Sequence, residues 1–201
     1  MKNRKEYQQQ SPAVDQMKQE LKQIRYKRAY ARTLRSTLAC VVMAAALILC
    51  AVAFLPIIRI TGDSMSHTLN RGDILLTLRG DEVQRGDLIV FYVEGNKMLV
   101  KRAVAVAGDR VEMTEDGVLI VNDQPVDEPY ISSRALGECD QEFPLVVPQE
   151  RVFVLGDHRE LSIDSRSSAM GCIAREQVIG KAAVRIWPLN ALGLIAGNGT
   201  K

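Results

Sequence analysis

The sequence predicts a mainly β domain, of sandwich or barrel form, preceded by one membrane-spanning helix. Three observations predict this fold class. Residues 36–58 form an uncharged apolar run, seven short β-rich runs follow it, and turn sequences rich in Gly, Asn and Asp separate those runs. Many short strands divided by turns are typical of sandwiches and barrels. The chain of 201 residues is long enough for one folded domain with accessory segments.

Residues 1–35 form a basic segment, with ten Lys or Arg against three Asp or Glu and a net charge of +7. We expect a helix over residues 13–35, because apolar side chains recur there every three or four positions. These side chains are Val14, Met17, Leu21 and Ile24. Ser11 and Pro12 suit the cap and the first position of that helix. The simplest interpretation is a solvated helix beside anionic lipid.

The apolar run of residues 36–58 contains 23 residues without a charge. About 20 helical residues cross the hydrocarbon core of a bilayer, so we expect this run to be a transmembrane anchor. Basic flanks stay in the cytoplasm, which would leave residues 59–201 on the extracytoplasmic face of the cell membrane. A cleaved secretory signal is the alternative, because residues 51–53 (Ala-Val-Ala) fit a small-x-small motif. The long leader and the apolar residues up to Ile58 oppose it, and whether this motif is ever cut stays open.

Residues 59–201 are expected to supply the strands of the β domain. The seven β-rich runs are residues 73–78, 87–93, 98–108, 110–113, 117–122, 151–156 and 181–187. Residues 122–150, with four prolines, indicate a long excursion from the sheets rather than a linker, because β-rich sequence resumes at Arg151. Residues 36–201 carry 16 basic and 21 acidic residues, a net charge of −5 without a basic cluster, which argues against nucleic-acid binding.

Ser64 is a candidate nucleophile, since it lies in the stretch GDSMSHTL just after the apolar run. A serine hydroxyl needs a neighbour that accepts its proton. His67 is three residues away, and His158 directly follows Asp157. Catalytic partners usually converge from distant segments, and no Asp-x-x-His sequence is present, so a Ser–His esterase is disfavoured.

Lys101 is the alternative base. A lysine with its ordinary pKa of about 10.4 is protonated at neutral pH, but burial lowers that pKa by several units. Lys101 lies in the apolar run MLVKRAVAVAG, where a period of two places it on one face with Ala103 and Ala105. The competing interpretation is an edge-strand lysine that extends its amine to water.

No metal or cofactor site is expected. The two histidines are 91 positions apart, and no cysteine or histidine spacing matches a metal-ligand pattern. Cys139 and Cys172 fall in the extracytoplasmic part, where a disulfide is permitted. The sequence leaves open whether these two cysteines pair.

Four stretches occur in the order GDSMSHTLNRGDILL, QRGDLIVFYV, KRAVAVAGDRVEM and VLGDHRELSIDSR. In this order they resemble the four conserved boxes of the type I signal peptidases, which are membrane-anchored Ser–Lys endopeptidases. The resemblance extends over about residues 57–189, and the single N-terminal anchor agrees with it. It implies a catalytic domain of coiled antiparallel sheets that acts without a cofactor. The implied partners are membrane lipid and the signal peptides of secreted preproteins, cut after a small-x-small motif; the preferred preproteins and the oligomeric state stay open.

The resemblance also implies a role for each matching position. Ser64 stands at the nucleophile and Lys101 at the general base. Ser162 stands where a serine helps to orient the lysine. Asp164 and Arg166 stand where an ion pair braces the site.

Several positions depart from the family's pattern. Gly62 stands where some members carry a serine that donates to the oxyanion, so a second donor here must come from elsewhere. His67 and Ala107 replace prolines, and His158 and Leu161 replace asparagines. These departures fit tolerated drift or a specialised substrate range. They also leave a second hypothesis, a catalytically impaired membrane-anchored homologue that binds signal peptides or a partner without cutting them.

Overall fold

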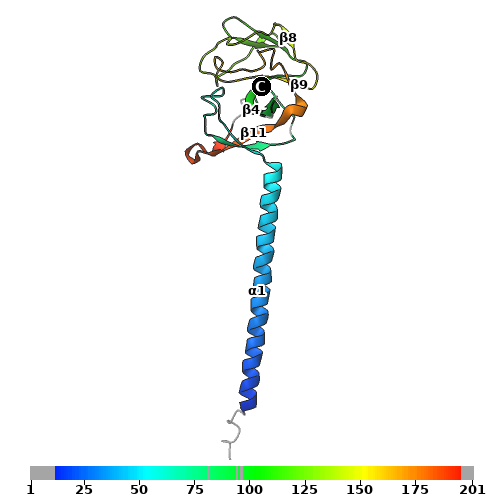
Figure 1. The fold of residues 1–201 in the computed structure, drawn as a ribbon, viewed down its shortest axis with the longest axis vertical. Helices are drawn as coiled ribbons and strands as arrows, with labels where there is room; N and C mark the ends of the chain where they lie inside the picture. The colour runs from blue at the N-terminus through cyan, green and yellow to red at the C-terminus, as the bar shows by residue number, and fades with distance from the viewer. Residues whose placement is uncertain (1–11, 81, 94, 96, 196–201) are drawn as a thin grey trace, which may run out of the picture. The chain divides into compact units, whose positions relative to one another are not determined.

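The computed structural model describes residues 12–80, 82–93, 95 and 97–195, and the chain divides into two compact units, residues 1–51 and 52–201. The first unit is built on one continuous helix, α1 (Pro12–Phe54), of 43 residues (Figure 1). At 1.5 Å per residue this helix is about 65 Å long, roughly twice the hydrocarbon thickness of a bilayer. It contains a stretch, Gln16–Cys50, that is long and apolar enough to cross a membrane. The expected helix over residues 13–35 is therefore confirmed and continues into the apolar run; its expected cap, Ser11, lies outside the described residues.

The helix α1 ends before Ile58, the expected end of the apolar run. Pro56 disfavours helical backbone at the residue before it, and the chain then enters β1 (Ile57–Arg59). Ile58 is buried in the core of the β-rich unit. The last two residues of the apolar run thus belong to a strand rather than to the helix.

The second unit confirms the prediction of a mainly β domain. The seven expected runs coincide with β2 (Ile74–Leu78), β3 (Leu88–Val93), β4 (Lys97–Val106), β5 (Arg110–Met113), β6 (Leu119–Val121), β9 (Arg151–Leu155) and β11 (Val178–Trp187). Shorter elements that the sequence did not predict are β1, β7 (Gln124–Pro125), β8 (Leu145–Val146), β10 (Ile173–Ala174), β12 (Gly193–Leu194) and the 3-10 turns η3 (Arg175–Gln177) and η4 (Leu189–Ala191).

The strands form two antiparallel sheets. The larger sheet has the order β1-β2-β11-β3-β4-β9-β10, with β12 also paired to β11, and the smaller sheet has the order β7-β6-β5-β8. The strand β11 pairs with β3 through its first half and with β2 through its second half, and register shifts interrupt both pairings. Such shifts mark bulges, which increase the twist of a strand. The larger sheet is therefore coiled, as the resemblance implied.

Three clusters of buried apolar side chains form the core. The first gathers β1, β2 and the segment around Ser64, and includes Ile58, Met65, Leu69 and Leu75. The second holds side chains of both sheets, such as Val104, Val111, Leu119 and Phe153, and so joins the two sheets. The third is built from β3, β4, β9 and β10, with Phe91, Ala103, Val154 and Ile173 among its members.

The strand β4 lies inside the larger sheet, between β3 and β9, and carries Lys101 opposite Ile89 of β3. The competing interpretation, a lysine that extends its amine to water, is wrong, because Lys101 is only 2% exposed even though β4 pairs with β9 only from Arg102 onward. A register shift against β9 falls between Ala103 and Ala105, and these two alanines pack in different core clusters. The expectation that both share the face of Lys101 is also wrong, because the bulge interrupts the alternation of side chains.

The expected excursion from the sheets is present over residues 122–150. It contains only the short strands β7 and β8, and its remaining described residues form turns and irregular backbone. Cys139 in this excursion and Cys172 before β10 are both free thiols in the structure. Burial raises the pKa of the Cys172 thiol above its ordinary value.

Candidate active site

The segment 62–69, here called the Ser64 turn, leads from the core back toward the surface. Ser66 donates its backbone N–H to the Asp63 carbonyl at 3.0 Å, and Leu69 donates to the Met65 carbonyl at 2.8 Å. Met65 and Leu69 therefore lie on one side of a helical turn, where they are 2% and 0% exposed. Anchoring that side in the core leaves Ser64 on the other side, half-buried.

Lys101 is buried against an uncharged partner. Its side chain is only 2% exposed, and Nζ donates a hydrogen bond to Oγ of Ser162 at 2.7 Å. Ser162 comes from residues 156–166, here called the support loop, which follows β9. The structure thus brings together the sequence-predicted Lys101 and Ser162, which are 61 positions apart in the chain.

Three buried ion pairs include a residue of the support loop, and each joins an arginine to a carboxylate. Two of them are Arg102–Asp157, at 2.7 Å, and Arg166–Asp164, at 2.8 Å. The third is Arg159–Glu128. A buried charge is tolerated when it is paired and hydrogen-bonded. Each pair carries no net charge, because one arginine neutralises one carboxylate. No salt bridge found among the described residues includes Lys101.

This arrangement lowers the pKa of Lys101 to about 8, with loss of hydration as the largest cause. Asp164 and Asp157 act in the opposite direction and favour the charged amine, while Arg166 adds to the lowering. Because each of these carboxylates is paired with an arginine, their attraction for the amine only partly offsets its burial. A substantial fraction of Lys101 is consequently neutral at mildly alkaline pH.

Asp164 and Arg166 form a rigid brace within the support loop. Burial alone would raise the pKa of Asp164, but hydrogen bonds and the charge of Arg166, with the N–H of Gly156, lower it overall. The guanidinium of Arg166 also donates to the carbonyls of Arg159, at 2.8 Å, and Ser162, at 3.2 Å. The brace therefore fixes the backbone of the residue that holds Lys101.

Gly156 is a site residue that the sequence reasoning missed. A Cβ atom at this position would lie 2.6 Å from the carbonyl oxygen of Ser64 and still closer to the side chain of Ser162. Only glycine allows the Ser64 turn and Ser162 to approach each other this closely. The possible signal was the glycine that directly precedes Asp157, but a Gly-Asp pair also suits an ordinary turn.

Ser64 and Lys101 belong to segments that meet at Gly156. No hydrogen bond between Ser64 Oγ and Lys101 Nζ is found in the part of the chain that the structure describes. The structure therefore brings Ser162 to Lys101 and places the backbone of Ser64 beside Ser162, with the hydroxyl of Ser64 unbonded to the amine. Gly62 is exposed, and a Cβ there would have open space within 4 Å.

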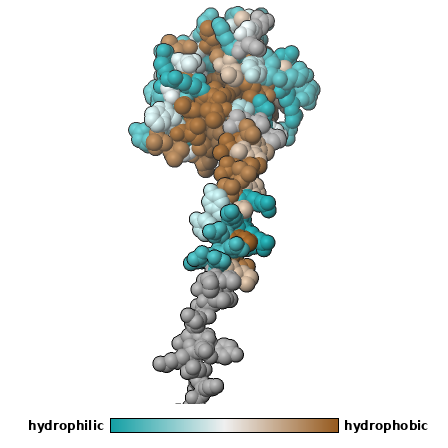
Figure 2. Space-filling model, turned by 60° about the horizontal axis from the view of Figure 1, so that its bottom comes forward, coloured by the Kyte–Doolittle hydropathy of each residue, from teal (hydrophilic) through white to brown (hydrophobic). Residues whose placement is uncertain are grey.

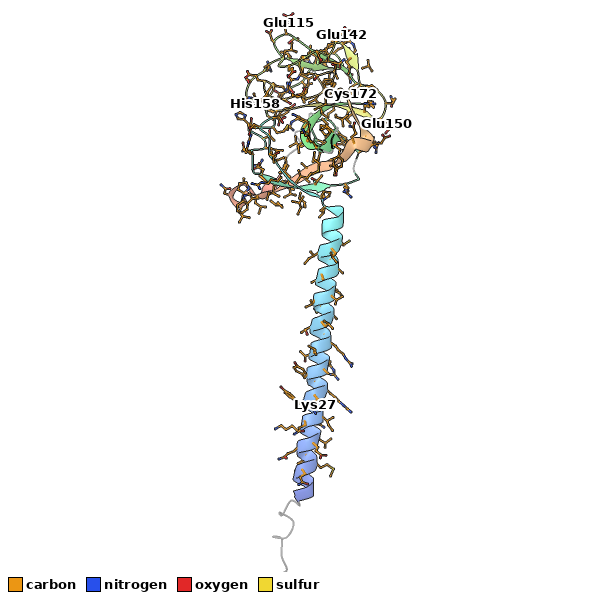
Figure 3. The ribbon with its side chains drawn as sticks, viewed as in Figure 1. Lys27, Glu115, Glu142, Glu150, His158 and Cys172 are labelled. Carbon is orange, nitrogen blue, oxygen red and sulfur yellow. The ribbon has the colours of Figure 1, made fainter. Side chains whose placement is uncertain are left out.

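The four family departures lie outside this buried centre. Ala107 and Leu161 are exposed, and so is His67. His67 has φ of +82°, a backbone conformation that proline, with φ near −65°, does not adopt. His158 is half-buried and lies at the rim of the β-rich unit, away from Cys172 (Figure 3). Its ring reaches Ser66 rather than Ser64, with Nδ1 at 2.7 Å from the Ser66 hydroxyl.

A cleft of about 120 Å³ borders Ser64. One wall consists of residues 58–62 with Ser64 and Met65, and the other of residues 98–100 in β4. The strand β1 is at the edge of the larger sheet, and β4 pairs with β9 only from Arg102 onward. Both walls therefore offer strand edges without a partner among the described residues, which suits an extended peptide. In that same part of the chain, no group of three or more His, Cys, Asp or Glu side chains could hold a metal ion.

Replacement of Gly156 by alanine is expected to lower the free energy of unfolding by about 1–3 kcal/mol or more, because the added methyl forces Ser162 and the Ser64 turn apart. Thermal or urea unfolding of purified protein measures this change. Gly193→Ala is the matched control, since a Cβ at Gly193 meets nothing within 4 Å. Equal stability of the two variants would contradict the close approach at Gly156.

Replacement of Lys101 by methionine is expected to raise the free energy of unfolding at pH 7 by up to about 3 kcal/mol, because a shift from 10.5 to about 8 measures the cost of burying the charged amine. The unfolded chain binds more protons than the folded one between these two pKa values, so wild-type stability should rise with pH over that window. Lys101→Met should lack this rise. The exposed Lys97, on the same strand, supplies the control Lys97→Met, whose pH profile should match wild type.

Comparison with known proteins identifies the family. The family described as "Signal peptidase, peptidase S26" matches residues 32–187. Signal peptidase IB of Staphylococcus aureus is 33% identical over 150 residues, which cover 65% of this chain and 77% of that protein. Signal peptidase I of Leptolyngbya laminosa is 34% identical over 148 residues, covering 67% of this chain and 70% of that protein. A crystal structure of a signal peptidase I from Enterococcus faecalis covers 50% of this chain and 97% of its own, with 28% identity and a TM-score of 0.41. The family match spans more than half of the chain, and the chain therefore belongs to the signal peptidase family.

Proposed function

We propose that this protein is a type I signal peptidase in which Ser64 is the nucleophile and Lys101 the general base. Family membership gives the reaction class, removal of signal peptides from preproteins by a serine peptidase. One observation carries the assignment of the base. Lys101 is buried against the neutral hydroxyl of Ser162, while the neighbouring buried arginines are paired with carboxylates. An amine kept in this way can lose its proton near neutral pH and accept another.

In the proposed reaction the Ser64 oxygen forms a bond to the scissile carbonyl carbon while its proton passes to Nζ of Lys101. Collapse of the tetrahedral intermediate breaks the C–N bond, and the Lys101 ammonium protonates the departing amine of the mature protein. Water then attacks the acyl-enzyme ester and gives its proton to Lys101. Cleavage of the ester C–O bond then returns the proton from Lys101 to the Ser64 oxygen, and the signal peptide leaves as a carboxylic acid that loses its proton to solvent.

Two features support a Ser64–Lys101 pairing during this cycle. Gly156 lets the Ser64 backbone approach Ser162, the hydrogen-bond partner of Lys101. Rotation about χ1 moves the hydroxyl of Ser64 between staggered positions without any movement of the backbone. Catalytic hydrogen bonds are also often unformed before substrate binds. Closure of the Ser64–Lys101 hydrogen bond is therefore assigned to the complex with substrate.

The oxyanion of the intermediate needs fixed hydrogen-bond donors. The backbone N–H of Ser64 is one proposed donor. Gly62 has no side chain to supply a second, although the open space beside it would accommodate one. A second hydrogen-bond donor to the oxyanion must then come from another group, as the glycine at position 62 already indicated in the sequence.

The cleft beside Ser64 supports an extended substrate with small side chains. Its two walls are unpaired strand edges that suit a peptide backbone. Its volume of about 120 Å³ and its apolar lining, including Ile58, Ile60 and Val100, favour small apolar side chains over long or charged ones. This supports cleavage after a small-x-small motif.

An exposed apolar face supports contact of the β-rich unit with lipid. It lies on β1, β2, β11 and β12, which belong to the larger sheet, and on the residues around η4. Its exposed members are Ile57, Leu78, Trp187, Leu189, Leu192 and Leu194. Figure 2 shows a broad hydrophobic area on this unit. Contiguous apolar surface of this kind marks an interaction site. We assign the helical part of the apolar run, residues 36–54, as the membrane anchor, residues 1–35 to the cytoplasm and the β-rich unit from β1 onward to the extracytoplasmic face.

Ser64→Ala and Lys101→Ala are each expected to lower cleavage of a small-x-small signal peptide by at least about 1,000-fold, because each removes one half of the proton-transfer pair. The assay uses the full chain in lipid vesicles, with near-ultraviolet circular dichroism to check folding. Ser168→Ala and Lys97→Ala, on exposed residues, are the controls and should cleave at the wild-type rate. Retained cleavage by folded Lys101→Ala protein would overturn the assignment. Wild-type protein that binds the peptide without cutting it would favour the non-catalytic hypothesis.

The pH dependence of kcat/KM should report the base. Because Lys101 acts only when neutral, kcat/KM should rise about tenfold per pH unit at low pH and level off above pH 8, near its pKa. Peptide cleavage between pH 5.5 and 10 measures this profile. A limb near pH 6.5, the ordinary pKa of an imidazole, would instead implicate a histidine.

A further inference from the structure

The Ser64 turn and the support loop are joined by three hydrogen bonds. The backbone N–H of His158 donates to the carbonyl oxygen of Ser64 at 3.0 Å. A second bond, of 2.7 Å, joins Nδ1 of His158 to Oγ of Ser66. The third runs from Oγ1 of Thr68 to Asp157 at 2.5 Å. His158 thus holds the turn at two alternate residues, one of them Ser64 itself.

The side chain of His158 and the apolar core hold opposite sides of this turn. Met65 and Leu69 fix the inner side in the first core cluster. On the outer side, Ser66 is held by His158. Restraints at Ser64, Met65 and Ser66 leave little freedom in the backbone of Ser64, and this backbone sets the direction of its Cα–Cβ bond. The direction of that bond decides whether the Ser64 hydroxyl can turn toward Lys101.

His67 makes the restraint on Ser66 tighter. Its Nδ1 lies 2.9 Å from the carbonyl oxygen of Ser66, an atom that only accepts, so this nitrogen must carry a proton and donate it. Its ring also meets the ring of His158 edge-on, with centroids 6.3 Å apart. The positive φ of His67 is a strained backbone conformation for an L-residue. Two histidines far apart in the sequence therefore enclose one serine.

We propose that His158 is a positioning residue for the peptidase reaction, acting through Ser66 to orient Ser64 toward Lys101. This inference rests on the proposed function of Ser64 and Lys101. His158 does not act as the base itself, because Nδ1 is engaged with Ser66 and its backbone, not its ring, contacts Ser64.

The bond between His158 and Ser66 needs a hydrogen-bonding side chain at residue 158 rather than a charged one. The charged neighbours of His158 already have partners: Asp63 pairs with Arg71, Asp157 with Arg102, and Arg159 with Glu128. An asparagine amide can place a polar atom about where Nδ1 of a histidine lies, and it both donates and accepts. His158→Asn therefore keeps the bond to Ser66, whereas His158→Ala removes it.

The test measures kcat and KM for a small-x-small peptide with His158→Ala, Ser66→Ala, the double variant and His158→Asn. His158→Ala and Ser66→Ala should each lower kcat by about 10- to 100-fold, because a shift of about 1 Å in a reacting group has effects of this size. KM should stay within about twofold of wild type, since the walls of the cleft do not include His158 or Ser66. The double variant should be no slower than the slower single variant. His158→Asn should recover at least half of the wild-type kcat.

Ser168→Ala is the matched control, because it removes a hydroxyl bonded to Asp140 in another part of the unit. It should leave kcat unchanged. Ser66→Ala keeps the test valid if His158→Ala fails to fold, since it deletes a single oxygen. Wild-type kcat in either folded variant, or losses that multiply in the double variant, would overturn the positioning role. Ser64→Ala in the same assay separates the two proposals: activity retained there refutes the nucleophile, whereas activity lost there with full kcat in His158→Ala refutes only this inference.

Discussion

The loss of hydration around the amine of Lys101 is the constraint on which the rest of the site depends. A buried lysine without a carboxylate partner is unfavourable in a folded protein, and the structure contains several devices that hold it there. Lys101 is buried on β4, and the two carboxylates that act on it, Asp157 and Asp164, are each paired with an arginine. The support loop then offers the amine a hydroxyl instead of an anion. Burial of this amine lowers the free energy of unfolding and, for the same reason, lowers the pKa of Lys101.

The support loop does several tasks within a few residues. Asp157 pairs with Arg102 and accepts a hydrogen bond from Thr68. Gly156 allows the Ser64 turn to approach Ser162, and Ser162 accepts a hydrogen bond from Lys101. Arg166 and Asp164 fix the backbone between them. The loop therefore connects β4 to the Ser64 turn, two segments that share no strand pairing. Rigid support from neighbouring groups is what keeps reacting side chains in productive geometry.

Much of the fold followed from local sequence. Runs of β-branched residues between Gly- and Asp-containing turns located β2 to β6, β9 and β11, and an uncharged run of sufficient length located the helix. Ser64 and Lys101 were candidates from their own sequence context, whereas Ser162 was predicted only through the resemblance. The bulge at Ala103–Ala105 and the role of Gly156 were not predictable, because both depend on contacts between distant segments. The meeting of His67 with His158 escaped notice for the same reason, since a spacing of 91 positions carries no local signal.

The cleft beside Ser64 has a consequence for the breadth of its substrates. Main-chain amides and carbonyls on an unpaired strand are the same whatever side chains a bound segment carries. A groove bordered by two such edges would recognise the extended backbone of a bound peptide rather than its amino-acid sequence. Because only the small volume of the cleft restricts the side chains of the substrate, one enzyme of this design would process many exported proteins. Their leader peptides would share an extended shape and hydrophobicity but little sequence identity.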